Sequence, residues 1–163
     1  MVNSTIAEHN IECTTCHPVE PDVTLRNAEC PLSGTLCGRI QRLTVEHLIK
    51  PELVGSISDS QYYYCDDADC PVVYFTQGGS GTFTKGDLQV AVYDKDPGEN
   101  VNVCFCFDWT RKRITDQIKT SGRSTAFDEI SDELNAGNCE CDIKNPKGVC
   151  CLGDINKFAK EIV

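Results

Sequence analysis

Residues 103–109 of this 163-residue chain read VCFCFDW, and residues 139–154 read CECDIKNPKGVCCLGD. The intervening sequence has apolar residues every three or four positions, with a glycine after each run, which predicts two short helices over residues 110–120 and 125–135. A hairpin of two such helices returns the chain to its starting end, where the two cysteine groups meet. Four converging thiolates are what an iron–sulfur cluster requires, so the sequence predicts one in the C-terminal half.

Each expected helix carries a narrow apolar stripe. The first has Ile114 and Ile118, and the second has Phe127, Ile130 and Leu134. A last helix is expected from Asp154, as N-cap, with its buried face made of Ile155, Phe158, Ala159 and Ile162. Helix N-termini stabilise nearby negative charge, so helices that begin just after cysteines suit an anionic cluster. The basic run 111–113 either adds positive field there or forms a solvated helix face.

The β part of the chain is expected over residues 61–93. It contains QYYYC, PVVYF, the glycine-rich turn GGSGT and LQVAVY, each short and bounded by turn residues, which predicts a small antiparallel sheet. Before it, Thr44 is the expected N-cap of a short helix VEHLIK that Pro51 stops. Cys65 and Cys70 join two of these strands, and a C-x4-C turn of this kind presents two thiolates to one zinc ion.

These motifs together resemble CopZ-type copper chaperones. The resemblance rests on a CxC, a further CxC, the run NPKGVCCLGD, and the segments YYYCDDADCPVVYF and LTVEHLIKPEL, and it covers roughly residues 30–157. The CxC followed by a helical hairpin also looks like bacterioferritin-associated-ferredoxin (BFD-like) domains, although those have a CxxC second pair. The resemblance implies an α+β fold in which a zinc-bound β-rich domain precedes a BFD-like helical domain with a 2Fe-2S cluster.

Six cysteines compete for the four ligand positions of that cluster. Cys104 and Cys106 are the only thiols on their side of the hairpin. The family spacing selects Cys141 and Cys151 as the other two. Cys139 and Cys150 are then buried apolar thiols, or they replace Cys141 and Cys151 as ligands.

The zinc site needs two ligands besides Cys65 and Cys70. Relatives of the CopZ type supply a CPxC knuckle, whereas this chain reads CPLSG, which puts Ser33 where a thiolate is expected. Cys30 remains a good ligand, and Cys37 is our choice to complete the tetrahedron. The alternative fourth ligands are in the N-terminal arm: Cys13, Cys16 and His17.

The arm sequence Cys13-Thr14-Thr15-Cys16-His17 invites a copper-site interpretation. However, no methionine precedes the first cysteine, and Pro18 and Pro21 obstruct the helix that copper-binding MxCxxC motifs require. The arm therefore offers either a transient Cu(I) site or an incidental surface pair of cysteines.

Composition excludes several classes of protein. The net charge is −10, from 25 acidic and 15 basic residues, which argues against nucleic acid as a partner. The first 20 residues lack the apolar core of a secretory signal, and no run is long enough to span a membrane. We therefore expect a cytoplasmic protein without membrane insertion, where cysteines bind metal more often than they form disulfides, the alternative for this even set of 12.

The expected organisation is an arm over residues 1–29, a zinc domain over 30–95 and a cluster domain over 96–163, divided at the linker DKDPGEN. No catalytic group is expected, because His9, His17 and His47 accompany no serine nucleophile pattern. We expect a metal-handling protein that acts as one-electron redox partner or chaperone for copper or another soft metal, with the metal ion or a metal-transport protein as partner. The alternative is a sensor or structural module whose cluster and zinc pass no electrons.

Overall fold

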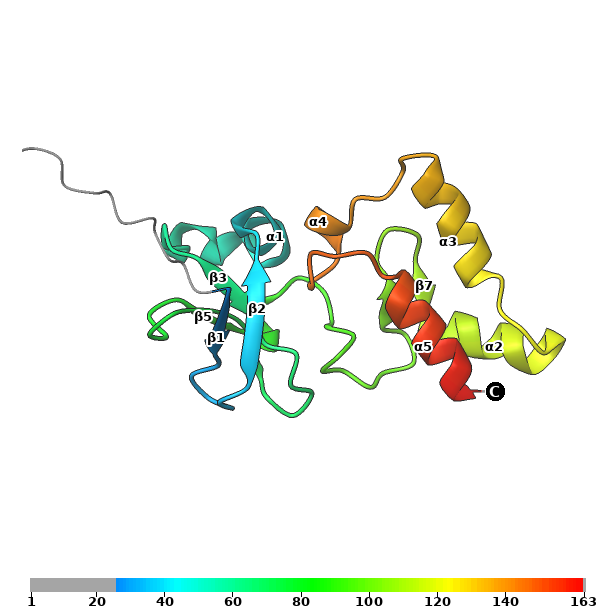
Figure 1. The fold of residues 1–163 in the computed structure, drawn as a ribbon, viewed down its shortest axis with the longest axis horizontal. Coiled ribbons are helices and arrows are strands. Elements are labelled where there is room, and N and C mark those ends of the chain that lie inside the picture. The colour runs from blue at the N-terminus through cyan, green and yellow to red at the C-terminus, as the bar shows by residue number, and fades with distance from the viewer. Residues whose placement is uncertain (1–25, 163) are drawn as a thin grey trace, which may run out of the picture.

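The computed structural model describes residues 26–162, which form two lobes side by side (Figure 1). One lobe is a small antiparallel sheet covered by a short helix, and the other is mainly helical. The α+β class expected from the sequence is confirmed. No helix among these residues is long and apolar enough to cross a membrane.

The sheet has five strands in sequence order, each antiparallel to its neighbour. Helix α1 (Arg42–Leu48) and a 3-10 helix (Pro51–Ser56) connect the second and third strands, and a second 3-10 helix (Lys85–Asp87) follows the fifth. The strands are β1 (Asn27–Glu29), β2 (Leu36–Ile40), β3 (Tyr62–Tyr64), β4 (Val72–Thr76) and β5 (Thr82–Thr84).

Both faces of this sheet are buried, and the alternation along β3 shows why. Tyr62 and Tyr64 point to one core with Val45 of α1, whereas Tyr63 points to the other face and stacks on Phe75 with ring centroids 5.6 Å apart. That second core also contains four cysteines: Cys30, Cys37, Cys65 and Cys70. The sheet thus has an aromatic face and a thiol-bearing face.

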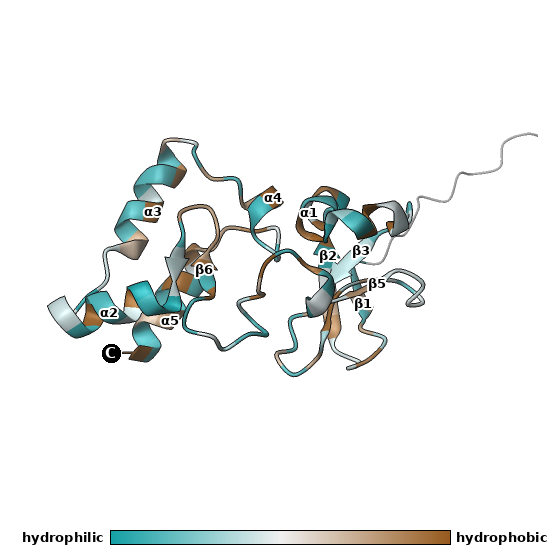
Figure 2. Ribbon diagram, turned by 180° about the vertical axis from the view of Figure 1, so that it is seen from behind, coloured by the Kyte–Doolittle hydropathy of each residue, from teal (hydrophilic) through white to brown (hydrophobic). Residues whose placement is uncertain are grey.

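The second lobe is built on a two-stranded ribbon and three main helices, whose hydrophobic bands alternate with hydrophilic ones (Figure 2). Its core joins Trp109, Ile114 and Ile130 to Cys104 and Cys151. The elements are β6 (Asn102–Cys104), β7 (Trp109–Thr110), α2 (Arg111–Ser121), α3 (Ala126–Asn135), α4 (Cys141–Lys144) and α5 (Leu152–Ile162).

The two predicted helices are present within one residue of their expected bounds, but they do not pack on each other as a hairpin, because α5 packs against both of them instead. Thr110 caps α2 by accepting a hydrogen bond from the backbone N–H of Arg113 at 3.1 Å, and Gly122 ends the helix with a left-handed φ of 78°. The last helix begins at Leu152, two residues before the expected N-cap Asp154, which lies in its first turn.

Three expectations for the first lobe are wrong. Residues 88–93 form no strand, because Gln89 bonds across the end of α1 to Leu48 instead, and only Leu88 makes an isolated bridge, to Ile49. Residues 27–29 belong to the sheet as β1 and not to the arm. The N-cap of α1 is Gln41 and not Thr44.

The linker between the lobes is irregular in structure, as expected, but α2 holds it in place. The guanidinium of Arg111 donates to the carbonyls of Tyr93 at 2.5 Å, Asp96 at 2.6 Å and Gly98 at 3.2 Å. It also stacks over the Tyr93 ring, 4.4 Å from the centroid. One side chain therefore fixes the path of the chain between the two lobes.

The apolar stripe of α3 is narrower than predicted. Ile130 is completely buried, whereas Phe127 and Leu134 are 45% and 40% exposed. The reason is that α5 packs along only one side of α3, so only the middle of the stripe meets the core.

This difference predicts unequal costs for two similar substitutions in α3. Ile130→Ala should lower the free energy of unfolding by about 2–5 kcal/mol, because it opens a cavity in the core. Leu134→Ala, the matched control, should lower it by about 0.5 kcal/mol or less. Urea denaturation followed by circular dichroism measures both, and equal costs would contradict the packing described here.

Candidate metal centres

The first centre is the N-terminal thiol group, which we define as Cys30, Cys37, Cys65 and Cys70. All four thiols are buried and free. The sulfur atoms of Cys30, Cys65 and Cys70 lie within 4.8 Å of one another, and those of Cys30 and Cys70 are 3.8 Å apart. A tetrahedron with Zn–S bonds of about 2.3 Å has S···S edges of about 3.8 Å, so this spacing fits zinc.

Two tight turns place these thiols. Cys30 directly follows β1, and its backbone accepts a hydrogen bond from Gly34 N–H and donates to Thr35 O, both at 2.9 Å. Cys65 and Cys70 flank the turn between β3 and β4, as predicted, with the carboxylate of Asp67 accepting from Asp69 N–H at 3.0 Å. The C-x4-C spacing therefore brings two sulfurs to one face of the sheet.

The fourth position of this group is contested. Cys37 lies in β2 and touches Cys65, but its thiol donates to Thr35 O at 3.1 Å and falls outside the compact set of three sulfurs. The hydroxyl of Ser33 lies 3.8 Å from the Cys65 sulfur. The serine in CPLSG therefore does face the site. Cys13, Cys16 and His17 lie outside the described residues.

The thiols of this group differ in acidity. Burial raises the pKa of Cys65 to about 12. Burial also acts on Cys30, but hydrogen bonds from the Ser33 side chain and from the backbone of Ser33 and Leu32 outweigh it and lower its pKa to about 7. Since the thiolate is the metal ligand, Cys30 is already prepared to bind at neutral pH.

A buried cation supports this centre. Lys95, only 5% exposed, donates from Nζ to the carbonyls of Asp67 at 2.6 Å and Cys70 at 3.0 Å. It thus holds both ends of the turn between Cys65 and Cys70 and places a positive charge beside a thiolate site. Lys95 belongs to the linker, and nothing in its sequence context pointed to this role.

The second centre is the C-terminal thiol group, which we define as Cys104, Cys106, Cys139, Cys141 and Cys151. The sulfurs of Cys106 and Cys141 are 3.6 Å apart. Cys151 hydrogen-bonds with both Cys104 and Cys141. The structure therefore brings together all four residues predicted as cluster ligands, from the segments before α2 and after α3.

Short elements fix the direction of these side chains. Cys104 ends β6, and Cys106 lies in the turn to β7, where Asp108 adopts a left-handed φ of 53°, a conformation that aspartate tolerates. Cys141 opens α4, and Cys151 immediately precedes α5. The backbone N–H of Glu140 donates to the Cys106 sulfur at 3.4 Å, which ties the segment after α3 to the ribbon.

The loop between Cys141 and Cys151 is anchored on the other lobe. The hydroxyl of Tyr74 in β4 donates to Pro146 O at 2.8 Å, and that of Thr44 in α1 donates to Asp142 O at 2.6 Å. Figure 1 shows α4 against α1 at this junction. The sheet thus positions two of the predicted cluster ligands.

In the NPKG run of this loop, Asn145, Lys147 and Gly148 each make a contact that holds the loop in place. The buried amide of Asn145 donates to Val149 O and accepts from Lys147 N–H. Lys147 bridges Asp94 of the linker at 3.1 Å and Asp154 of α5 at 2.9 Å. Gly148 has a φ of 65°, and a Cβ there would lie 2.9 Å from Thr44 Oγ1. Substitution of this glycine would therefore push the loop off α1.

Acidity in this group is also divided. A hydrogen bond with Cys151 lowers the pKa of Cys104, and a similar bond lowers that of Cys141 to about 6. The same two bonds raise the pKa of Cys151, whereas burial raises that of Cys106 to about 12. With its pKa lowered to about 6, Cys141 is a thiolate at neutral pH and can begin metal binding.

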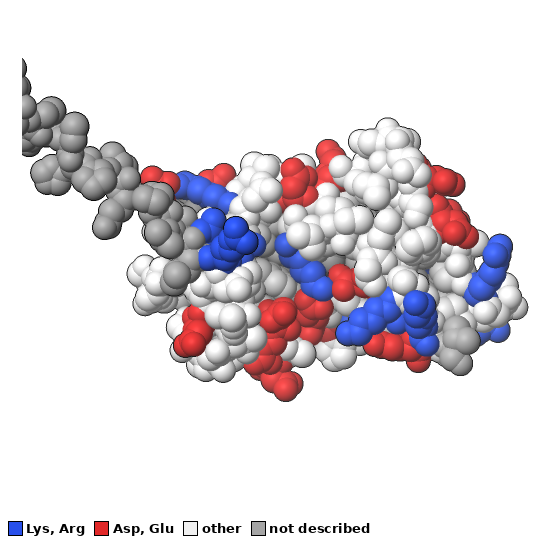
Figure 3. Space-filling model, in the orientation of Figure 1, with Lys and Arg blue, Asp and Glu red and all other residues white. Residues whose placement is uncertain are grey.

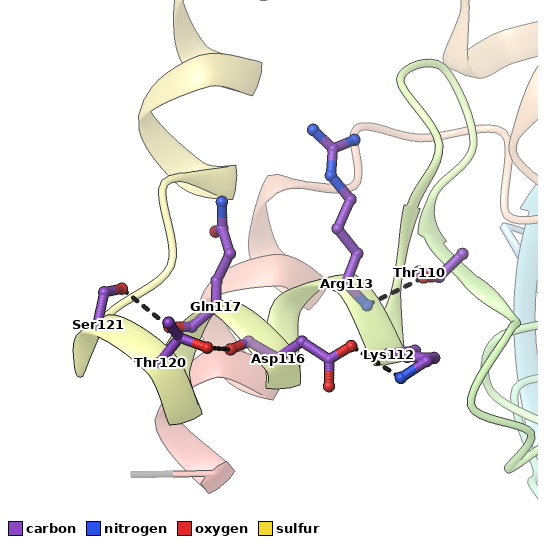
Figure 4. A pocket seen from close by; sticks show the side chains of 7 residues that line it. All are labelled: Thr110, Lys112, Arg113, Asp116, Gln117, Thr120 and Ser121. Atoms are coloured by element: carbon purple, nitrogen blue, oxygen red, sulfur yellow. Dashed lines mark hydrogen bonds and ion pairs between the residues drawn. The ribbon is translucent and has the colours of Figure 1, made fainter.

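Cys150 and the basic run fall outside the metal centre. Cys150 is exposed. Arg111 holds the linker and Arg113 stacks over Trp109, 3.5 Å from the ring centroid. Lys112 pairs with Asp116 on the outer face of α2, beside a shallow polar hollow that contains no thiol (Figure 4). Residues 111–113 therefore do not all form a solvated helix face, nor do they all add positive field near the cluster.

The surface carries charges of both signs. On the face seen in Figure 3, lysines and arginines alternate with aspartates and glutamates, and no continuous basic patch forms among the described residues there. Nucleic-acid backbones bind clustered cations, so this face does not resemble a nucleic-acid interface.

Comparison with known proteins agrees with the geometry of the first centre. Residues 27–89 match the family of CopZ-type zinc binding domains, which accounts for the whole sheet and its four thiols. The class defined by fold and sites is thus a cysteine-rich α+β metal-binding protein with a zinc binding domain.

One relative, matched both in sequence and in solved structure, extends the similarity to the second lobe. The chain is 33% identical over 123 residues to the copper chaperone CopZ of Archaeoglobus fulgidus, an alignment that covers 75% of this chain and 57% of that protein. The X-ray structure of the N-terminal domain of the same CopZ matches with a TM-score of 0.65 and 29% identity, over 80% of this chain and 97% of that domain. The chain therefore spans little more than half the length of full CopZ.

The position of Lys95 predicts its effect on zinc binding. Lys95→Met removes two hydrogen bonds and the adjacent positive charge, so it should weaken zinc retention roughly tenfold or more, as loss of groups behind metal ligands does. Competition with a chromogenic chelator measures the change. Lys85→Met, an exposed lysine of the same lobe, is the control and should bind zinc as the wild type does. Equal affinity of the two variants would refute a role for Lys95.

Proposed function

We propose that this protein carries one zinc ion and one 2Fe-2S cluster and serves in the handling of copper or another soft metal. The observation that carries the proposal is the gathering of thiols into two separate groups, one in each lobe. Similarity to the copper chaperone CopZ supports copper as the metal, since soft thiolates select Cu(I).

For zinc we propose Cys30, Cys65 and Cys70 as three ligands and Cys37 as the fourth. Three mutually close sulfurs support the first three. Cys37 is preferred to Ser33 because structural zinc sites favour thiolates over hydroxyls, and because Cys37 already contacts Cys65. This ion would connect β1, β2 and the turn after β3, and so stabilise a lobe with only short strands.

For the cluster we propose Cys104, Cys106, Cys141 and Cys151 as ligands, in a BFD-like helical domain. Their contacts form a chain from Cys104 through Cys151 and Cys141 to Cys106, which supports this choice over one that includes Cys150. When bound, a 2Fe-2S cluster supplies one electron per reduction cycle. The ribbon and the NPKG loop orient the thiols, and the core around Trp109 limits the access of water on one side.

The proposed role is one-electron reduction of Cu(II), or of another oxidised soft metal ion, before its transfer to a metal-transport partner. Reduced protein would convert one Cu(II) to one Cu(I) and end with its own centre oxidised by one electron. Cys106 and Cys139 are partly exposed, which gives a metal ion access to this side of the centre. The CTTCH segment remains a proposed transient Cu(I) site.

The alternative function is a sensor or structural module in which both metals only hold the fold together. The anchoring of the NPKG loop on the first lobe favours the sensor function, because a change in one centre would shift the other. Electron transfer to an added metal ion separates the two functions.

We also propose the division into domains at residues 95 and 96, since each side has its own thiol group. A chain of residues 96–163 should then assemble a cluster alone, although less stably than the full chain because it lacks Thr44 and Tyr74. Iron content after anaerobic reconstitution measures this. A fragment that binds no iron would show that the sheet is essential and the boundary incorrect.

The redox proposal predicts the behaviour of two cysteine variants. Cys104→Ser and Cys106→Ser should each lose the visible thiolate-to-iron absorption and the ability of reduced protein to convert Cu(II) to Cu(I), because serine is a harder, poorer ligand. Stopped-flow absorption during Cu(II) addition measures both properties.

The control for this experiment is a variant that lacks Cys13 and Cys16. It should keep the cluster spectrum, because the proposed ligands are elsewhere, and lose only metal capture. If reduced wild-type protein is not oxidised by Cu(II) at a potential that permits it, the redox function falls and the sensor function replaces it.

A further inference from the structure

Cys139 is the one thiol of the C-terminal group that is not among the four proposed cluster ligands. Its sulfur lies within 4.8 Å of those of both Cys106 and Cys141. It is partly exposed and free. A thiol this close to two ligands needs only a small displacement to reach the position of either.

The backbone around Cys139 permits such a displacement. The segment follows α3, which ends at Asn135, and Gly137 turns the chain with a φ of 79° and open space around it. Hydrogen bonds lie on either side of Cys139: the Asn138 amide donates to the Glu133 carboxylate of α3, and the Glu140 N–H donates to the Cys106 sulfur. Cys139 is thus held near the centre by its neighbours in the chain, while its own side chain is partly exposed.

We propose that Cys139 is a reserve ligand that binds iron in place of Cys141 when the Cys141 sulfur no longer binds it. This proposal rests on the proposed cluster. In the exchange, the Cys139 thiol releases its proton to solvent and forms the iron–sulfur bond that Cys141 no longer makes, so no oxidant or reductant is needed.

Cys141 is the ligand that Cys139 replaces, because the two are separated by a single residue and hydrogen-bond with each other. Cys104 and Cys151, by contrast, are completely buried in the core of the lobe. A reserve thiol would keep the centre assembled when an incoming soft metal ion binds the Cys141 thiolate and takes it from the iron.

Cys150 provides a matched control. It is also a spare cysteine next to a proposed ligand, but it is exposed and belongs to no group of mutually close sulfurs among the described residues. Proximity in sequence is therefore similar for the two spare cysteines, whereas proximity in space differs.

The experiment compares the full-length wild type with Cys141→Ser, Cys141→Ser/Cys139→Ser and Cys141→Ser/Cys150→Ser after anaerobic reconstitution. Iron content and visible circular dichroism report the cluster. Iodoacetamide labelling followed by peptide mass spectrometry reports which thiols iron protects. We expect Cys141→Ser to retain most of its iron with an altered dichroism spectrum, and the double variant with Cys150→Ser to behave in the same way.

The variant without Cys139 and Cys141 should lose the cluster. Cys139 should be alkylated in the loaded wild type and protected in loaded Cys141→Ser. If Cys141→Ser alone loses its iron, or if Cys141→Ser/Cys139→Ser keeps all of it, the proposal is overturned. In both cases a wild type that binds iron leaves the proposed function intact. A wild type that takes up no iron overturns both.

Discussion

The hydrogen bond between Tyr74 and Pro146 fixes the loop of the second centre against the first lobe. The hydroxyl comes from the middle of the sheet, and the carbonyl belongs to the loop that carries Cys141 and Cys151 at its ends. Thr44 supports the same loop from α1, and Lys147 fixes it between two carboxylates. Because buried polar groups are costly to leave unpaired, these bonds define one position for the loop. Helices α2, α3 and α5 pack so that the thiols before α2 and after α3 lie near one another, and the first lobe then fixes the loop that carries two of them.

Each lobe has a lysine in the structure that surrounds its thiol group. Thiolate sites are anionic, and this chain already carries a net charge of −10. Lys95 places a buried ammonium at the turn of the first centre, and Lys147 lies in the loop of the second, between Asp94 and Asp154. Lys95 and Asp94 are adjacent in the linker. A short segment of chain therefore contacts the surroundings of both centres, which gives a physical route by which one could influence the other.

The sequence predicted what depends on local pattern. Helices α2 and α3 follow from apolar spacing and from glycine stops, and the turn between Cys65 and Cys70 follows from the strands around it. It did not predict short strands such as β1 and β6, which have three residues each and exist only through their partners. Nor did it assign Thr44, Tyr74 or Lys95 to their roles, because each acts across a long sequence separation. Ile130 was correctly placed in the core, but Phe127 and Leu134 were not, because the position of α5 decides which residues of α3 are buried.

The most direct measurement is redox-titrated electron paramagnetic resonance combined with metal analysis on anaerobically prepared full-length protein. Two separate thiolate centres predict about two iron ions and one zinc ion per chain. They also predict a paramagnetic signal that appears on one-electron reduction and disappears in Cys104→Ser. Protein that contains zinc at both centres, or that remains free of iron and without a reducible signal after reconstitution, would contradict a 2Fe-2S cluster held by Cys104, Cys106, Cys141 and Cys151.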